Sequence, residues 1–268
     1  MLRHRRRHLR GMGNHTLSGL RAAIGLLTRL PMGQVGEADL AKAVGWIPFV
    51  GGVIGLVIAL AYILALQVLP SLPAAGFAVT LGILVTGAFH EDGLADVADG
   101  FGGSSDREEV IRIMRDPVHG TYGVMALVAS FVLRVGALAT LCVGGALVIL
   151  PVVHALSRGA SIGVMATLPA ASAAGVGAAF ANLGKGGRAT LGILVAIGIG
   201  LLTLGWWTMA FAALAAIGAV SLGRLARSRI EGFTGDVLGA VEQIDEVMLL
   251  LVGAALAWTG VVTGAWWT

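Results

Sequence analysis

The sequence predicts an all-α polytopic membrane protein, a bundle of about seven transmembrane helices. Hydrophobic residues make up 57% of the 268 positions and charged residues only 12%, whereas a soluble chain carries about 45–50% and about 25%. Apolar runs of about 18 residues or more recur, and each is long enough to cross a hydrocarbon core of about 30 Å. This composition excludes a soluble enzyme, a disordered protein and a nucleic-acid-binding domain.

Seven apolar runs are predicted to span the membrane, with short breaks between them. Pro70 and Pro73 bracket the first break, where one helix ends and the next begins. The chain holds 41 glycines, so neighbouring helices can approach closely, as in small-residue membrane interfaces. The predicted spans are residues 47–69, 72–90, 121–144, 146–168, 189–205, 206–222 and 247–266.

The charged residues predict how this bundle is oriented. Every cation except Arg134 and Arg158, and all 15 acids, fall in segments that seven spans place on one side of the membrane. The positive-inside rule assigns that side to the cytoplasm. We therefore expect a protein of the bacterial cytoplasmic (inner) membrane with a cytoplasmic N-terminus and cytoplasmic active-site segments. The charged segments are residues 1–46, 91–120, 170–188 and 223–246.

Residues 1–46 precede a transmembrane catalytic domain at 47–268. The first ten residues are rich in arginine, and the apolar stretch 17–30 is interrupted by two further arginines and lacks a small-residue cleavage site. We interpret this stretch as an interfacial amphipathic helix and not as part of a signal peptide. The basic tail either interacts with anionic lipid or precedes a translation start at Met12.

The segment after the second span carries an acidic cluster. Asp92, Asp96 and Asp99 stand at i, i+4 and i+7, so on a helix they fall within an arc of about 60°. Carboxylates suit hard cations such as Mg²⁺, which binds one or two of them together with substrate phosphates. Gly93 and Gly100 would leave room for a phosphate beside the acids. The alternative, a solvated acidic face, does not explain why acids gather beside a bundle so poor in charge.

Several basic residues are candidates to bind an anion. Arg115 either forms ion pairs on an exposed helix or grips a phosphate, and we interpret His119 as an ordinary loop histidine. Arg134 and Arg158 fall inside predicted spans, where a cation costs about 2.5–3.5 kcal/mol and normally faces a partner or a wet cavity. His154 precedes Arg158 by one turn. These residues either pair internally or bind an anionic substrate.

A third polar region precedes the last predicted span. Thr234 and Asp236 stand among glycines just before a helix is expected to begin. Either residue can be a simple N-cap. We favour the interpretation in which Asp236, with Glu242 or Glu246, joins the metal and phosphate site from a second direction.

Taken together, these segments resemble the cobalamin-5′-phosphate synthase family, also called adenosylcobinamide-GDP ribazoletransferases. The run from His90 to Gly100 is similar to the signature H-x-D-G-L-A-D-x-x-D-G, with Glu91 in place of the usual leucine. The other matches follow in the family's order over about residues 28–246. They are Thr28-Arg29-Leu30-Pro31, Ile113-Met114-Arg115-Asp116 with Gly120 and Gly123, Ser157-Arg158, and the run from Thr234 to Ala240.

The resemblance implies transfer of cobinamide phosphate from adenosylcobinamide-GDP to α-ribazole or its 5′-phosphate, with release of GMP and a requirement for Mg²⁺. The metal ligands would be Asp92, Asp96 and Asp99, and Glu91 either adds a fourth ligand or points away. Arg115 would stabilise the developing phosphate charge, and Asp96 or Asp236 would act as general base. Arg134, Arg158, His154 and Thr234 would contact substrate.

Two alternatives remain at this point. A CDP-alcohol phosphotransferase also uses a helical aspartate cluster, but Asp96 stands where its motif has an arginine. An ion-coupled transporter would need acids buried in mid-span, whereas the expected position of every acid here is a cytoplasmic segment. The sequence leaves open the base of the ribazole, the need for its 5′-phosphate, the number of metals and whether the chain forms a homo-oligomer.

Overall fold

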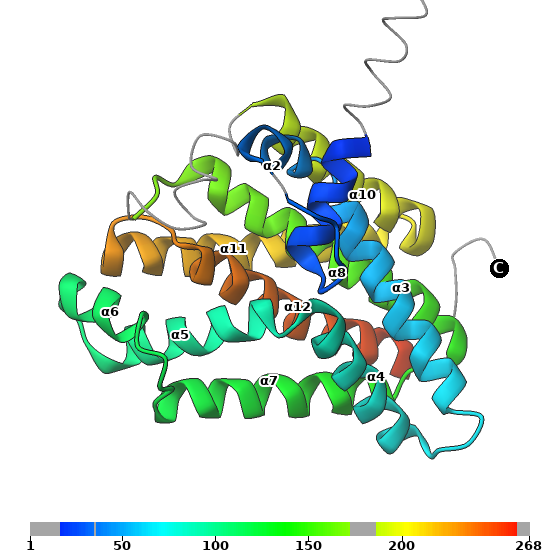
Figure 1. Ribbon diagram of the computed structural model, residues 1–268. Helices are drawn as coiled ribbons and strands as arrows, with labels where there is room; N and C mark the ends of the chain where they lie inside the picture. The colour runs from blue at the N-terminus through cyan, green and yellow to red at the C-terminus, as the bar shows by residue number, and fades with distance from the viewer. Residues whose placement is uncertain (1–16, 35, 172–185, 262–268) are drawn as a thin grey trace, which may run out of the picture.

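In the computed structural model (Figure 1), residues 17–34, 36–171 and 186–261 are described, and they fold as packed helices. The described part contains no strand, and a single parallel bridge joins Ala170 to Phe233. The predicted all-α class is therefore confirmed. The basic tail predicted over residues 1–16 lies outside the described residues.

The described helices follow one another along the chain, and residues 172–185, between Thr167 and Gly187, lie outside the described residues. A helix at Leu17–Leu27 comes first and coincides with most of the stretch predicted to be amphipathic. The helices after it are α2 (Glu37–Ala43), α3 (Ile47–Ala65), α4 (Ser71–Thr86), α5 (Phe89–Gly103), α6 (Arg107–Ile113), α7 (Thr121–Ala139), α8 (Val143–Thr167), α10 (Gly187–Leu204), α11 (Trp207–Ile230) and α12 (Gly235–Trp258).

The count of seven spans is not confirmed. Among the described residues, α3, α7, α8, α10 and α11 are long and apolar enough to cross a membrane. The predicted span 72–90 is broken: α4 and α5 meet at an angle of 90° and together make at most a sixth span. Gly87 and Ala88 form this elbow, since both have left-handed backbones with φ of 69° and 58°.

The last predicted span, 247–266, begins inside a helix that starts earlier than expected, and its residues 262–266 lie outside the described residues. Helix α12 begins at Gly235 and ends at Trp258. Its first half therefore carries Glu242, Asp245 and Glu246 into the interior, where each is at most 4% exposed. The expectation that every acid belongs to a surface segment is wrong for these residues.

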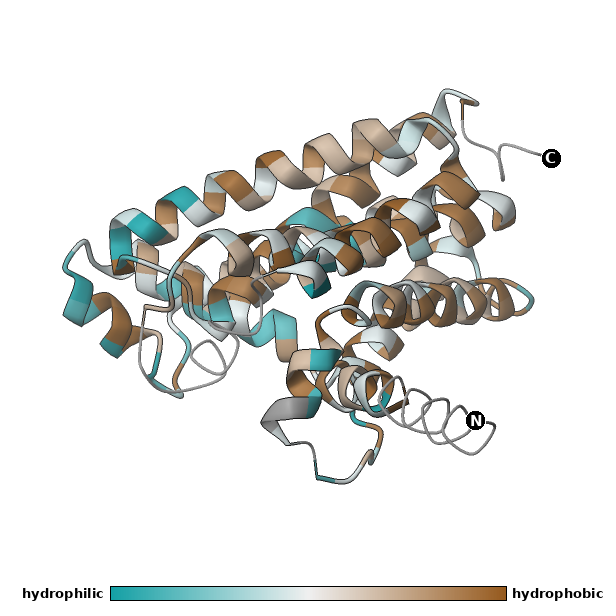
Figure 2. Ribbon diagram, turned by 90° about the horizontal axis from the view of Figure 1, so that it is seen from above, coloured by the Kyte–Doolittle hydropathy of each residue, from teal (hydrophilic) through white to brown (hydrophobic). Residues whose placement is uncertain are grey.

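Helix α8 lies at the centre of the bundle and contacts α3, α10, α11 and α12, while α5 and α7 pack on the other side of α12 (Figure 1). Glycine permits the closest of these approaches, as predicted. A Cβ at Gly55 of α3 would lie only 2.4 Å from the Leu150 carbonyl oxygen of α8. Figure 2 shows brown, hydrophobic residues along most of each helix and a concentration of teal residues at the end of the bundle where α6 lies.

Candidate active site

Two of the predicted metal ligands, Asp92 and Asp96, lie on one side of α5 and both approach His119. Asp92 Oδ1 lies 3.9 Å from His119 Nε2, and Asp96 Oδ1 lies 3.7 Å from His119 Nδ1. One ligand atom from each residue falls within 4.8 Å of the others. The Asp92 side chain is 66% exposed, whereas that of Asp96 is only 14% exposed. We call Asp92, Asp96 and His119 the acidic face, which is open to solvent at Asp92 and sheltered at Asp96.

Asp236 approaches the same acids from the start of α12. Thr234 caps this helix by accepting a hydrogen bond from the Val237 amide, and its hydroxyl also donates to Asp236 Oδ2 at 3.2 Å. A Cβ on Gly93 would meet the Asp236 carbonyl oxygen at 2.7 Å, so the two backbones touch. Asp92 and Asp236 are close enough to repel each other.

Opposing effects of its surroundings act on the pKa of Asp236. Burial raises the pKa of its carboxyl above the usual range, and the charge of Asp92 acts in the same direction. The hydrogen bond from Thr234 and the positive charge of Arg115 oppose that rise in pKa. Arg115 therefore acts electrostatically on Asp236, and its role as a phosphate-binding arginine stays a prediction.

Asp99 does not join the exposed acids. Its Oδ2 accepts a hydrogen bond from the Gly120 amide at 2.7 Å, and its Oδ1 accepts one from Gly123 at 2.8 Å. Gly120 is the N-cap of α7 and has no side-chain cap of its own, so Asp99 caps α7 from a neighbouring helix. Because His119 directly precedes this cap, Asp99 fixes the loop that brings His119 to Asp92 and Asp96.

Glu91, the fourth predicted metal ligand, points into the bundle. Its carboxylate accepts a hydrogen bond from Arg134 Nη1 of α7 at 3.1 Å. The same guanidinium lies 3.7 Å from Glu246 of α12, and Glu246 lies 3.1 Å from His154 Nε2 of α8. All four side chains are at least nine-tenths buried.

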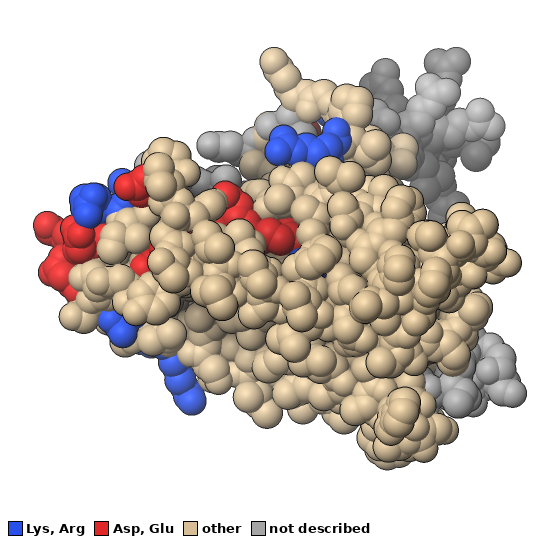
Figure 3. Space-filling model, turned by 90° about the horizontal axis from the view of Figure 1, so that it is seen from below, with Lys and Arg blue, Asp and Glu red and all other residues tan. Residues whose placement is uncertain are grey.

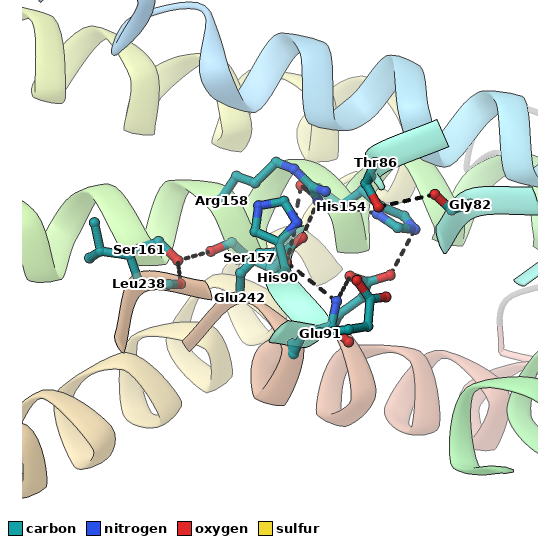
Figure 4. Close-up of polar contacts among 12 residues, drawn as sticks. Gly82, Thr86, His90, Glu91, His154, Ser157, Arg158, Ser161, Leu238 and Glu242 are labelled. Atoms are coloured by element: carbon teal, nitrogen blue, oxygen red, sulfur yellow. Dashed lines mark hydrogen bonds and ion pairs between the residues drawn. The ribbon is translucent and has the colours of Figure 1, made fainter. Parts of the chain in front are cut away.

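Arg158 of α8 completes this buried network. Its Nη1 forms an ion pair with Glu242 of α12 and donates to the His154 carbonyl oxygen at 2.9 Å. Glu242 in turn lies 3.1 Å from His90 Nδ1 at the start of α5. Figure 4 shows these side chains pointing toward one another between the helices. We call Glu91, Glu242 and Glu246 with Arg134, Arg158, His90 and His154 the buried charge network.

The buried charge network bears on the predicted substrate contacts. Two small cavities border it, of about 20 Å³ and about 70 Å³, each large enough for water but far below the volume of a ligand pocket, about 300–1,000 Å³. Arg134, Arg158 and His154 therefore find their anionic partners inside the chain. Their role as substrate ligands stays a prediction, and Glu242 and Glu246 do not reach the acidic face.

The glycines of α5 serve helix packing. We expected Gly93 and Gly100 to leave space for a phosphate. The backbone of Asp236 fills the space at Gly93, and a Cβ on Gly100 would lie 2.5 Å from Met114 Cγ. That expectation was wrong, because the bare helix surface admits α12 and the end of α6.

Comparison with known proteins agrees with the motifs that converge here. A family model described as cobalamin-5-phosphate synthase matches residues 19–254. The chain belongs to this family. The match covers the acidic face, the cap of α7 and the buried charge network alike.

Curated relatives match over similar lengths. An adenosylcobinamide-GDP ribazoletransferase from Bradyrhizobium diazoefficiens is 38% identical over 90% of this chain and 95% of its own length. Proteins of the same name from Rhizobium etli and Ralstonia pickettii are 40% and 37% identical, over 85% and 88% of this chain and 93% and 94% of theirs. No solved structure matched the chain.

One argument for an enzyme over a transporter does not hold in the structure, and family membership now supports that conclusion instead. We favoured an enzyme over a transporter because all acids were expected outside the spans, yet several are buried beside arginines. Sequence reasoning also undervalued His119, whose only signal was its position between Arg115 and the two glycines that Asp99 binds. The burial of Glu242 and Glu246 carried a signal too, because they share a helix face one turn apart and match the spacing of His154 and Arg158.

Proposed function

We propose that this chain transfers cobinamide phosphate from adenosylcobinamide-GDP to a hydroxyl of α-ribazole or its 5′-phosphate and releases GMP. The curated relatives carry this activity in their name. The observation that carries the proposal is the convergence of Asp92, Asp96 and Asp236 with His119 and Arg115 on one exposed face. The apolar helices support a membrane location for this activity, and we propose the bacterial cytoplasmic membrane with the acidic face in the cytoplasm.

The acidic face suits Mg²⁺. Two carboxylates, Asp92 and Asp96, offer oxygen atoms a few ångströms apart, and Mg²⁺ usually takes one or two carboxylates and completes its shell with water and substrate phosphates. Bound there, Mg²⁺ would neutralise charge on the diphosphate of the donor. Imidazole is a poor ligand for this ion, so we assign His119 to a phosphate oxygen and not to the metal.

The remaining residues handle the proton and the leaving group. The acceptor hydroxyl attacks phosphorus on the cobinamide side of the diphosphate, and the bond to GMP breaks. Asp236 accepts the hydroxyl proton, because it has a raised pKa, is held by Thr234 and is not assigned to the metal, whereas Asp96, whose pKa burial raises to about 7, is assigned to Mg²⁺. Arg115 and His119 stabilise the charge that develops on the departing phosphate.

The buried charge network holds the helices that carry these residues. His90 and Glu91 immediately precede Asp92 on α5, and both pair with residues of other helices. We assign this network a positioning role, since its members pair with one another and the two cavities beside it, of about 20 Å³ and about 70 Å³, are too small for a nucleotide.

The test is GMP release by the purified chain in detergent, followed by separation of nucleotides. We expect release only when adenosylcobinamide-GDP, α-ribazole or its phosphate, and Mg²⁺ are all present, and none after EDTA. Folded protein that releases no GMP from the complete mixture would contradict the proposal. Release in EDTA would keep the transferase and reject the metal.

A further inference from the structure

A second cavity lies away from the acidic face, between α8, α10 and α11. It measures about 440 Å³ and is lined almost entirely by small and aliphatic side chains, among them Gly159, Gly163, Ala196, Ala216 and Ala219. None of its lining residues belongs to the acidic face or to the buried charge network. The cavity is a groove open along one side of the bundle and follows α11 from Ala212 to Arg227.

The two ends of α11 differ in chemistry. Trp206 and Trp207 stack at its start with ring centroids 4.5 Å apart, and Trp206 is 71% exposed. Arg224 and Arg227 stand near its end, are exposed and line the groove. From Trp207 to Arg224 the helix rises about 26 Å, close to the hydrocarbon thickness of about 30 Å. Tryptophan and arginine are typical of the two membrane interfaces, so the arginine end of the groove lies at a headgroup layer.

We propose that this groove binds one acyl chain of an anionic phospholipid, with its phosphate at Arg224 and Arg227. The groove extends about 22 Å along α11, which exceeds the half-thickness of about 15 Å that one leaflet's acyl chain spans. Its wall offers an acyl chain apolar contact and offers a polar reactant almost nothing. The two guanidinium groups at the mouth match an anionic headgroup, and within the described residues no ion pair is formed by either one.

Substitutions of Arg224 and Arg227 test whether their positive charge binds the lipid phosphate. The purified chain is reconstituted in nanodiscs of equal phosphatidylglycerol and phosphatidylcholine, released into detergent, and its retained lipids are measured by native mass spectrometry. Each basic residue near an anionic surface contributes about 1 kcal/mol, so Arg224→Gln with Arg227→Gln should lower phosphatidylglycerol retention about 25-fold. Arg224→Lys with Arg227→Lys should retain most of it. Arg112→Gln, which removes an exposed charge paired with Glu109 on α6, should change nothing.

A substitution in the wall tests the acyl chain. Ala216→Trp should fill the groove and abolish retention of either lipid, while the monomer mass and the melting temperature in detergent stay within a few degrees of the wild type. Equal retention of both lipids by the wild type, or unchanged phosphatidylglycerol on the double glutamine variant, would overturn the proposal. The proposal would also be overturned if Ala216→Trp converted a dimer into a monomer and still retained lipid. In that case a second copy of the chain would cover the groove.

Discussion

The acidic face and the buried charge network hold carboxylates of the same chain in opposite settings. Asp92 is 66% exposed and Asp96 is 14% exposed, and both lie beside His119. Glu91, only one residue away, is buried against Arg134, as Glu242 is against Arg158. Figure 3 shows the exposed acids, with red side chains in a hollow of a largely uncharged face, a group of blue side chains near its upper edge and further charges at the left end. Acids left to solvent can recruit a cation, whereas buried acids must bring their own counter-charges.

The largest expected effect on activity follows the removal of an exposed acid. Asp92→Ala should lower kcat/KM for GMP release by about a thousandfold or more, because loss of a metal ligand removes several kcal/mol of charge stabilisation. The melting temperature should stay near that of the wild type, since Asp92 is largely exposed. Glu108→Gln, an exposed acid on α6, is the matched control and should remain fully active. Asp92→Ala with wild-type activity would place the metal elsewhere.

Removing one buried partner should damage stability. Glu242→Ala leaves Arg158 without its ion-pair partner inside the bundle and should lower the free energy of unfolding by about 3–5 kcal/mol. Denaturation in mixed micelles measures this change. Glu242→Leu combined with Arg158→Met should recover much of it, because an apolar pair can replace a buried ion pair. A double variant that is stable and yet inactive would instead give Arg158 a direct role in the reaction.

Asp99 is intermediate between the two groups of acids, because its removal should lower both stability and activity. Asp99→Ala removes both hydrogen bonds to the start of α7 and should cost about 1–3 kcal/mol of stability. Activity should fall as well, because the loop carrying His119 loses its anchor. Asp99→Asn keeps an acceptor and should fall between wild type and alanine in both measurements. If Asp99→Ala abolished Mg²⁺ dependence and left stability unchanged, Asp99 would be a metal ligand after all.

The smallest expected effect concerns pH. A general base works only when deprotonated, and burial raises the pKa of Asp236. Activity should therefore fall on acidification at a pH above the usual titration range of an aspartate and be fully present above the raised pKa. The profile of kcat/KM against pH for the wild type measures this limb, and the residual activity of Asp236→Asn should lack it. An unchanged acidic limb in Asp236→Asn would leave Asp96 as the base.

Much of this arrangement could be predicted from the sequence, because it depends on local pattern. Long apolar runs predicted the helices, and the spacing of Asp92 and Asp96 placed them on one face. The elbow at Gly87 and Ala88 could not be predicted, since the apolar run continues through it. It turns α5 by 90° from α4.

The division among the acids depends on tertiary contacts. Neighbouring positions on a helix point to different sides, so Glu91 and Asp92 separate as soon as α5 has a buried face. Which face is buried depends on Arg134, about 43 residues later in the chain, and no local pattern reveals that pairing. The same holds for Asp99, whose hydrogen-bond partners Gly120 and Gly123 lie 21 and 24 residues later in the chain.

The most direct test of the difference between the acidic face and the buried charge network is the apparent Mg²⁺ affinity of two matched variants. Asp92→Asn and Glu242→Gln each remove one negative charge and keep the side-chain shape. GMP release is measured against Mg²⁺ concentration, with each variant's folded fraction determined separately. We predict that Asp92→Asn raises the half-saturating Mg²⁺ concentration at least tenfold, about 1.4 kcal/mol, and that Glu242→Gln leaves it unchanged per folded molecule. A Mg²⁺ requirement that shifts with Glu242→Gln and not with Asp92→Asn would contradict the account.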